Sequence, residues 1–322
     1  MNTNDPFTGF SGNPIMRIND LACTLNMPRR LQQRFSADQR EVAQSLPERN
    51  RRAAFVVDEY PACPDNWMRG SAKEASYFVP VLADHGLWLD FNDNKDHSHH
   101  VAAVISIQGV NAITGQPTSD MYLEQYRDNC PVHQIPFGHE RFCEKCGYKW
   151  EAQNYLAGNA QSNGYFWLDG FRAKDGETRQ FYFTEETLRG VAAQILGSER
   201  VFAIGIAFFL SKEPKPQPVV ADAYGYLGGG AMRGFLSSFN ERTLGIPDFQ
   251  ERTLEIAAGA KINQRIHPDP ESLDFWQPEP AGVIYVNYVD AETGWQIVTA
   301  GKRDLEAQGE GFMSTLKVGV QT

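Results

Sequence analysis

The sequence predicts an α+β fold with a β-rich, sandwich-like core and only a few helices. From Ala53 onward, short apolar runs are separated by turn residues, which is the pattern of consecutive strands. The clearest helical pattern starts at Thr184 and is short. A chain of 322 residues, 42% of them hydrophobic, is long enough to bury a sizeable core.

The composition excludes two classes of partner. The chain has 30 Lys and Arg residues against 40 Asp and Glu residues, a net charge of -10, and no dense basic run. Binding to nucleic acid through phosphates needs clustered positive charge, so we expect no nucleic-acid partner. The longest apolar run, 201–210, is about half of a bilayer span, so we expect no membrane association.

The termini and the cysteines bear on the compartment. The first residues show no basic segment followed by an apolar stretch, which predicts a cytoplasmic protein. Five cysteines are an odd number for a disulfide framework, and three of them lie within 130–146 beside histidines. This pattern is typical of thiolates that are kept reduced in order to bind metal.

Three regions are expected along the chain. Residues 1–50 form an N-terminal extension, in which a capping box at Ser36 predicts a short surface helix that ends at Pro47, with disorder as the alternative. Residues 51–213 form a β-rich core domain with an insertion at 128–150. Residues 214–322 form a C-terminal region of one helix plus a β-hairpin, joined to the core by the proline-rich segment 212–218.

The core elements follow from the apolar runs and the turns between them. Asp175-Gly176 supplies the positive φ values of a tight hairpin between 166–168 and 179–183. Thr184 caps a helix that ends at Gly197. Pro80 lacks an N–H group, so its strand is expected at a sheet edge. The other expected strands are 54–57, 77–82, 87–91, 101–107 and the buried run 201–210.

In the C-terminal region the pattern predicts a helix over 247–266 and strands at 283–289 and 295–299. Both alternating faces of 283–289 are largely apolar, so each face must be covered. We therefore expect a homo-oligomer, or a complex with a protein partner, through this region; the alternative is cover from the same chain. The glycine-rich stretch 225–234 lacks the spacing and the ending of a phosphate-binding loop.

The strongest chemical signal is a pair of short ligand motifs inside the insertion. Cys130 and His133 form one pair, and Cys143 and Cys146, followed by Gly147, form the other. Two pairs, each with two intervening residues, can wrap a tetrahedral Zn²⁺, which makes the insertion a zinc knuckle. His139 is an alternative to His133, and free thiols in a surface loop are the alternative to a metal site. Four protein ligands leave no open position, so the Zn²⁺ is expected to be structural, with Trp150 packed just outside it.

A second polar cluster runs from Asp90 to His100. It fails as an EF-hand, because Lys95 replaces the required glycine and Val101 stands where the bidentate carboxylate belongs. Three histidines, His97, His99 and His100, could instead ligate a transition metal with Asp93 or Asp96 and support metal-assisted hydrolysis. The simpler interpretation is a polar turn between two strands.

Several sequence blocks resemble those of a family of uncharacterised microbial proteins. The blocks are VISIQGVNAITGQP (104–117), QNYL (153–156), WLDGF (167–171), RQF (179–181), HPDP (267–270) and DFW (274–276). The resemblance implies a shared β-rich fold and carries no assignment of activity or of catalytic residues. The cysteine segment lies between the first two blocks as an insertion.

Taken together, these observations predict a non-catalytic, zinc-stabilised structural protein that assembles with itself or binds other proteins. No nucleophile elbow and no set of acid, base and nucleophile is visible in the sequence. The alternative is a metal-dependent hydrolase centred on Asp90 to His100.

Overall fold

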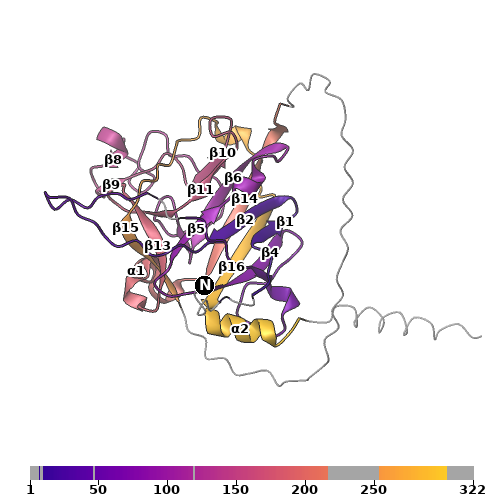
Figure 1. Cartoon of the computed structure of the whole chain (residues 1–322). Coiled ribbons are helices and arrows are strands. Elements are labelled where there is room, and N and C mark those ends of the chain that lie inside the picture. Colours follow the sequence, from indigo (N-terminus) through magenta and orange to yellow (C-terminus); the bar gives the residue numbers. More distant parts are fainter. Residues whose placement is uncertain (1–6, 8–9, 46–47, 119, 217–253, 303–322) are drawn as a thin grey trace, which may run out of the picture.

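The computed structural model describes residues 7, 10–45, 48–118, 120–216 and 254–302. Within this part of the chain, two seven-stranded sheets pack face to face, and a separate two-stranded ribbon projects beside them (Figure 1). The predicted β-rich, sandwich-like core is therefore confirmed. No helix among the described residues is long and apolar enough to cross a membrane.

The first sheet is antiparallel throughout. Its main order is β1, β2, β5, β13, β12, and two further strands join from the side: β11 pairs with β5, and β15 pairs with β13. The strands are β1 (Ile15–Ile18), β2 (Leu21–Asn26), β5 (Gly86–Asp90), β11 (Trp167–Leu168), β12 (Gly170–Arg172), β13 (Thr178–Thr184) and β15 (Glu255–Lys261).

The second sheet has the order β10, β6, β14, β16, β4, β3, with β7 paired to β6. Its strands are β3 (Phe55–Val56), β4 (Glu74–Val81), β6 (His99–Ile107), β7 (Val110–Asn111), β10 (Tyr155–Gly158), β14 (Ala203–Pro214) and β16 (Gly282–Asp290). β16 and β4 pair in parallel, whereas the other pairs of this sheet are antiparallel.

Apolar side chains from both sheets fill the space between them. Leu89 and Phe181 enter this core from the first sheet, and Ile105, Ile206 and Ile284 enter it from the second. The other face of the second sheet is also covered. Trp276 and Tyr155 belong to the cluster that covers one end, and Phe78, Trp67 and Ile297 belong to the cluster that covers the other.

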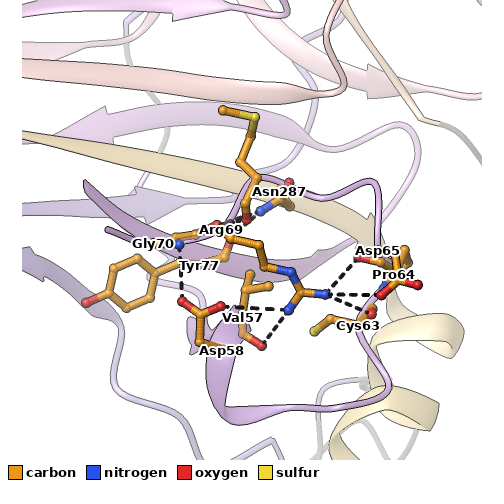
Figure 2. A network of polar contacts seen from close by, with 11 residues as sticks. Val57, Asp58, Cys63, Pro64, Asp65, Arg69, Gly70, Tyr77 and Asn287 are labelled. Carbon is orange, nitrogen blue, oxygen red and sulfur yellow. Dashed lines mark hydrogen bonds and ion pairs between the residues drawn. The ribbon is translucent and has the colours of Figure 1, made fainter. Parts of the chain in front are cut away.

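Arg69 holds the loop that covers the second of these ends. Its guanidinium donates to the carbonyl oxygens of Val57, Cys63 and Pro64 and forms ion pairs with Asp58 and Asp65 (Figure 2). These bonds fold residues 57–70 over Phe78, so that Val57, Tyr60 and Trp67 are buried against it.

Most of the predicted core elements are present. The runs 87–91, 101–107 and 201–210 correspond to β5, β6 and β14. The hairpin turn at Asp175-Gly176 is present, with Gly176 at a φ of 81°. Its first strand is β12 and not the expected 166–168, because β11 pairs with β5 instead. The strand of Pro80, expected at a sheet edge, is β4, which lies between β16 and the short edge strand β3. Pro80 lies beyond the two residues of β4 that pair with β3, so no neighbour on that side needs its missing N–H group.

The predicted helix at 184–197 is shorter than expected. A single 3₁₀ turn, η4 (Thr187–Arg189), comes first, and α1 (Val191–Leu196) follows and ends at Gly197, whose φ is 60°. Thr184 belongs to β13, and its hydroxyl accepts a hydrogen bond from the Glu186 backbone N–H rather than capping a helix.

The N-terminal prediction was wrong in two respects. Residues 15–26 are not an extension, because β1 pairs with β2, and β2 pairs with β5 inside the first sheet. No helix follows Ser36: its backbone N–H and its hydroxyl both bond the Arg40 carbonyl, closing a turn with Gln39 at a φ of 61°. The arm continues along the sheet edge, where Gln44 bridges to Ile262.

The C-terminal predictions were partly wrong. The strand at 283–289 is present as β16, but 295–299 belongs to the helix α2 (Ala291–Thr299), because the Asp290 side chain accepts the backbone N–H groups of Glu292 and Thr293. Residues 254–266, expected as the end of a helix, contain β15. The rest of that expected helix, 247–253, and the glycine-rich stretch 225–234 lie outside the described residues.

Both faces of β16 are covered within the chain. Ile284, Val286 and Tyr288 face the core between the sheets, and Val289 packs with Ile297 of α2, which Figure 1 shows at the base of the sandwich. The reason for expecting a partner on this strand is therefore removed.

Candidate metal centre and neighbouring cleft

The two predicted ligand pairs meet in the structure. One ligand atom from each of Cys130, His133, Cys143 and Cys146 lies within 4.8 Å of the others. His133 Nδ1 is 3.7 Å from the Sγ atoms of both Cys130 and Cys143. Tetrahedral Zn²⁺, with Zn–S bonds of about 2.3 Å and Zn–N bonds of about 2.0 Å, separates its ligand atoms by about 3.5–3.8 Å. The donor set and its spacing fit this ion.

Two turns position the four ligands. After Cys130, the Gln134 N–H bonds the Cys130 carbonyl, and the Cys130 N–H bonds the Ile135 carbonyl, so that His133 turns back toward the thiol. The second pair lies on the ribbon of β8 (Phe142–Cys143) and β9 (Tyr148–Lys149). Gly147, at a φ of 62°, donates its N–H to the Cys143 carbonyl and closes this turn.

A small apolar cluster surrounds the ligands. Cys130 and Cys143 are fully buried, and Tyr148 and Trp150 pack with them, as expected for Trp150. Burial acts to raise the pKa of the Cys143 thiol, but hydrogen bonds from the Cys146 backbone and thiol, the Cys130 thiol and the Lys145 backbone outweigh it and bring this pKa to about 6. A thiol of this pKa is mostly thiolate at neutral pH, which is the form that binds metal.

His139 does not belong to this group. It begins the short 3₁₀ turn η3 (His139–Arg141) and is exposed, whereas His133 is the histidine that lies beside the cysteines. The geometry therefore favours His133 as the ligand.

The histidines of the second polar cluster point to different partners. His97 Nε2 lies 2.9 Å from Asp20 Oδ2, His99 Nδ1 lies 2.8 Å from the Ser211 carbonyl oxygen, and the His100 ring contacts Phe275. His99 and His100 begin β6 and are half-buried. In the described part of the chain, these rings do not join a carboxylate in a group with the spacing of metal ligands.

Asp90 is buried at the end of β5, where Arg49 and Arg51 form ion pairs with its Oδ2 at 3.4 and 3.9 Å. These cations compensate the charge of the buried carboxylate. The turn after Asp90, expected to be a polar surface turn, also holds part of the fold together. Asn94 is buried, and its side chain accepts from the backbone N–H of Ala22 and donates to the Ala22 carbonyl oxygen.

The structure contains a cleft that the sequence analysis did not identify. It has a volume of about 1340 Å³ and lies between the 159–167 segment, the β12–β13 hairpin and residues 261–267. Lys149 of β9 is part of its wall, so the cleft is next to the ribbon that carries two of the metal ligands.

Asp169 is the most unusual residue in this wall. It is only 1% exposed; its Oδ2 accepts a hydrogen bond of 2.9 Å from Trp167 Nε1, and its backbone N–H donates to Gln264. Its Oδ1 is buried without a hydrogen-bond partner among the described residues. Burial raises the pKa of Asp169 to about 7, Trp167 acts in the opposite direction, and the Asp90 carboxylate raises it further. In the sequence, the signal that could have pointed to Asp169 is a single carboxylate inside the apolar and aromatic block WLDGF (167–171).

Comparisons with protein-family models, with curated proteins and with solved structures found no match. They neither support nor contradict the resemblance of the sequence blocks to a family of uncharacterised microbial proteins, which stays an expectation.

The ligand set leads to a first prediction. Purified protein should contain about one zinc per chain, and Cys143→Ser should lose it and lower the free energy of unfolding, because structural zinc binding contributes directly to folding. His133→Ala should also lose metal, whereas His139→Ala is the matched control that keeps it. Elemental analysis and urea unfolding measure both effects. Metal-free wild-type protein of unchanged stability would contradict the site.

Asp169 leads to a second prediction, for Asp169→Asn. An aspartate in an unfolded chain has a pKa of about 3.9, so the native state binds the extra proton between that pH and about 7. Native-state stability from this group is therefore present at low pH and is lost as pH rises through about 7. Asparagine does not titrate, so the variant does not lose this stability as pH rises. The free energy of unfolding of Asp169→Asn, relative to that of wild type, should therefore rise by about 1 kcal/mol between pH 6 and pH 8.

Urea unfolding at three pH values across this range measures that difference. Asp274→Asn, which removes one exposed carboxylate from a short 3₁₀ turn, is the matched control. A difference between Asp169→Asn and wild type that stays constant with pH would show that Asp169 does not titrate in this range.

Proposed function

We propose that this chain is a non-catalytic protein whose fold is stabilised by a structural Zn²⁺ and which assembles with itself or binds another protein. The observation that carries the first part is the convergence of four protein ligands within 4.8 Å. A tetrahedral ion held by four side chains has no position for water or substrate, so it stabilises structure instead of activating a nucleophile.

The way the knuckle is attached to the sandwich supports a structural role for the ion. The Tyr148 hydroxyl donates to the Thr114 carbonyl, and Arg141 donates to the carbonyl oxygens of Tyr126, Arg127 and Trp150. Tyr148 is adjacent to the second ligand turn, so loss of the ion would release the side chain that contacts the sandwich.

The alternative, a metal-dependent hydrolase at Asp90 to His100, has no observation in its favour. Its histidines bond Asp20 and Ser211 or contact Phe275, and Asp90 is neutralised by two arginines. We also propose a reducing compartment such as the cytoplasm, because none of the five cysteines is in a disulfide and the ligand thiolates must stay reduced.

Cobalt substitution tests whether the metal site is closed. Co²⁺ in place of Zn²⁺ should give the visible absorption of a tetrahedral thiolate site, and added azide should leave the spectrum unchanged, because no coordination position is open. A spectrum that changes with azide in a saturable way would reveal an open position and would overturn the structural assignment.

The second part of the proposal rests on exposed apolar side chains around α1. Leu188 of η4 is 89% exposed, and Ile195 of α1 together with Val201 and Phe202, just before β14, are also exposed. All four lie within residues 188–202, and exposed apolar side chains are typical of protein contact sites. This surface replaces the C-terminal one that the sequence favoured.

Light scattering during size-exclusion chromatography tests self-assembly through this surface. At tens of micromolar, wild-type protein should have a mass above the 36.2 kDa of one chain, and Leu188→Asp should return it to that value, because a buried unpaired carboxylate opposes association. Val42→Asp, at an exposed valine of the N-terminal arm, is the control that should change nothing. A wild-type mass of 36.2 kDa would contradict self-assembly.

A further inference from the structure

We propose that the cleft at Asp169 is a binding site for a short, uncharged oligosaccharide. This site is separate from the metal centre and goes beyond the function proposed above. The cleft is larger than the roughly 300–1,000 Å³ of most small-molecule pockets, so it has room for an extended ligand.

Two exposed aromatic rings are the first observation. Tyr165 and Trp167 line the cleft and are 42% and 40% exposed, although aromatic rings of this size are usually more buried. Both are held in place: Lys95 donates to the Tyr165 hydroxyl, and Asp169 accepts the Trp167 Nε1–H. A fixed, exposed ring face is a suitable surface for the apolar C–H face of a pyranose ring.

The second observation is the buried acceptor beside these rings. Asp169 Oδ1 has no partner within the described residues, although the side chain is 1% exposed and lines the cleft. A buried polar atom without a hydrogen bond costs free energy, and a hydroxyl group that reaches it would remove this cost. Sugar hydroxyls lie around the edge of a ring whose faces are apolar, so one ligand could satisfy both Asp169 and the aromatic rings.

The charges of the cleft select for a neutral ligand. Four cationic side chains line it, and three of them are already paired: Lys149 with Glu140, Arg172 with Glu151 and Lys261 with Glu177. The whole chain has a net charge of -10. A polyanion such as nucleic acid needs unpaired cations along its path, so its phosphates find little to bind here.

Amide side chains complete the polar lining. Asn159, Gln161, Asn263 and Gln264 all line the cleft. The buried Asn159 amide is already bonded to Asp269 and to the backbone of residues 161 and 162, whereas Gln161 is exposed and its amide offers both a donor and an acceptor. The Gln264 side-chain oxygen accepts a hydrogen bond from the Asp169 backbone N–H, and its Nε2 donates to the Trp167 carbonyl. These two bonds fix the backbone of Trp167 and Asp169, and with it the relative positions of the aromatic ring and the carboxylate. Groups of this kind match hydroxyls, which are donors and acceptors at once.

The test uses the full-length, zinc-loaded protein and a panel of tetra- to hexasaccharides of β-1,4-glucan, xylan, chitin and α-1,4-glucan. Titration calorimetry and tryptophan fluorescence should show saturable binding to at least one of these series. Trp167→Ala should weaken that binding roughly tenfold or more, the loss typical of an aromatic contact residue. Trp295→Ala is the matched control, because Trp295 is 43% exposed on α2, far from the cleft, and should leave binding unchanged.

Further variants keep the result open to contradiction. Tyr165→Ala should weaken binding while it leaves the hydrogen bond between Trp167 and Asp169 in place. Asp169→Asn removes the carboxylate, but its amide oxygen can still accept the hydrogen bond from Trp167. This variant therefore separates the effect of the carboxylate from that of holding the Trp167 ring in position. Equal circular dichroism and zinc content in each variant show that folding is retained. Absence of binding to every saccharide, equal binding by Trp167→Ala, or binding of a single-stranded oligonucleotide instead would overturn the proposal.

The outcome is distinguishable from that of the proposed function. If the metal site is not structural, the cobalt spectrum should change with azide while saccharide binding persists. Release of reducing ends from a bound oligosaccharide would support the cleft as a carbohydrate site and would overturn the non-catalytic part of the proposed function.

Discussion

The strands β6, β14 and β16 bury side chains on both of their faces, and this burial constrains the whole molecule. An apolar face left in water would cost about 25 cal/mol for each Å² of apolar surface, so both sides of the second sheet must be covered. The first sheet covers one side. The other is covered in two parts, by α2 with the Arg69 loop and by the segment that contains Trp276.

The segment around Asp269 links this covering role to the cleft. Asp269 accepts hydrogen bonds from the Tyr155 hydroxyl at 2.8 Å and from Trp276 Nε1 at 3.0 Å, which ties the segment to β10. Residues 261–267 come just before it and form one wall of the cleft. The cleft therefore results from a chain that leaves β15 in the first sheet and crosses to cover the second sheet.

The insertion that carries the Cys/His cluster (128–150) lies apart from this core and has few apolar residues of its own. Its cluster contains Cys130, Cys143, Tyr148 and Trp150 as buried members, which is too small to offset the ordering of the segment. A metal ion is the usual solution for a module of this size. The half-buried pair of Arg172 and Glu151 lies where the insertion returns to the sheet. Partial burial raises the pKa of Glu151, and the arginine opposes this.

Prediction from the sequence succeeded where a short window carries the information. The Cys/His cluster at 130–146, the turn at Asp175-Gly176 and the buried strand β14 all depend on residues close together in the chain. It failed for β15, whose alanines favour a helix but whose backbone pairs with β13, and whose Glu255 is buried against Arg200. It failed in the opposite direction for α2, where Trp295, Ile297 and Val298 favour a strand.

For α2, one capping residue and one close contact favour the helix over the strand that the local sequence favours. Asp290 caps the first turn, and Gly294 approaches Pro80 so closely that a Cβ there would lie 2.7 Å from the proline ring. The pairing of β2 with β5 and the cleft at Asp169 also unite segments that are far apart in the sequence. The sequence by itself therefore determined the Cys/His cluster at 130–146 and the β-rich character, because both are local patterns. Only the tertiary structure decided which segments pair, which helix forms and where a carboxylate is buried, because these depend on free energy gained from distant neighbours.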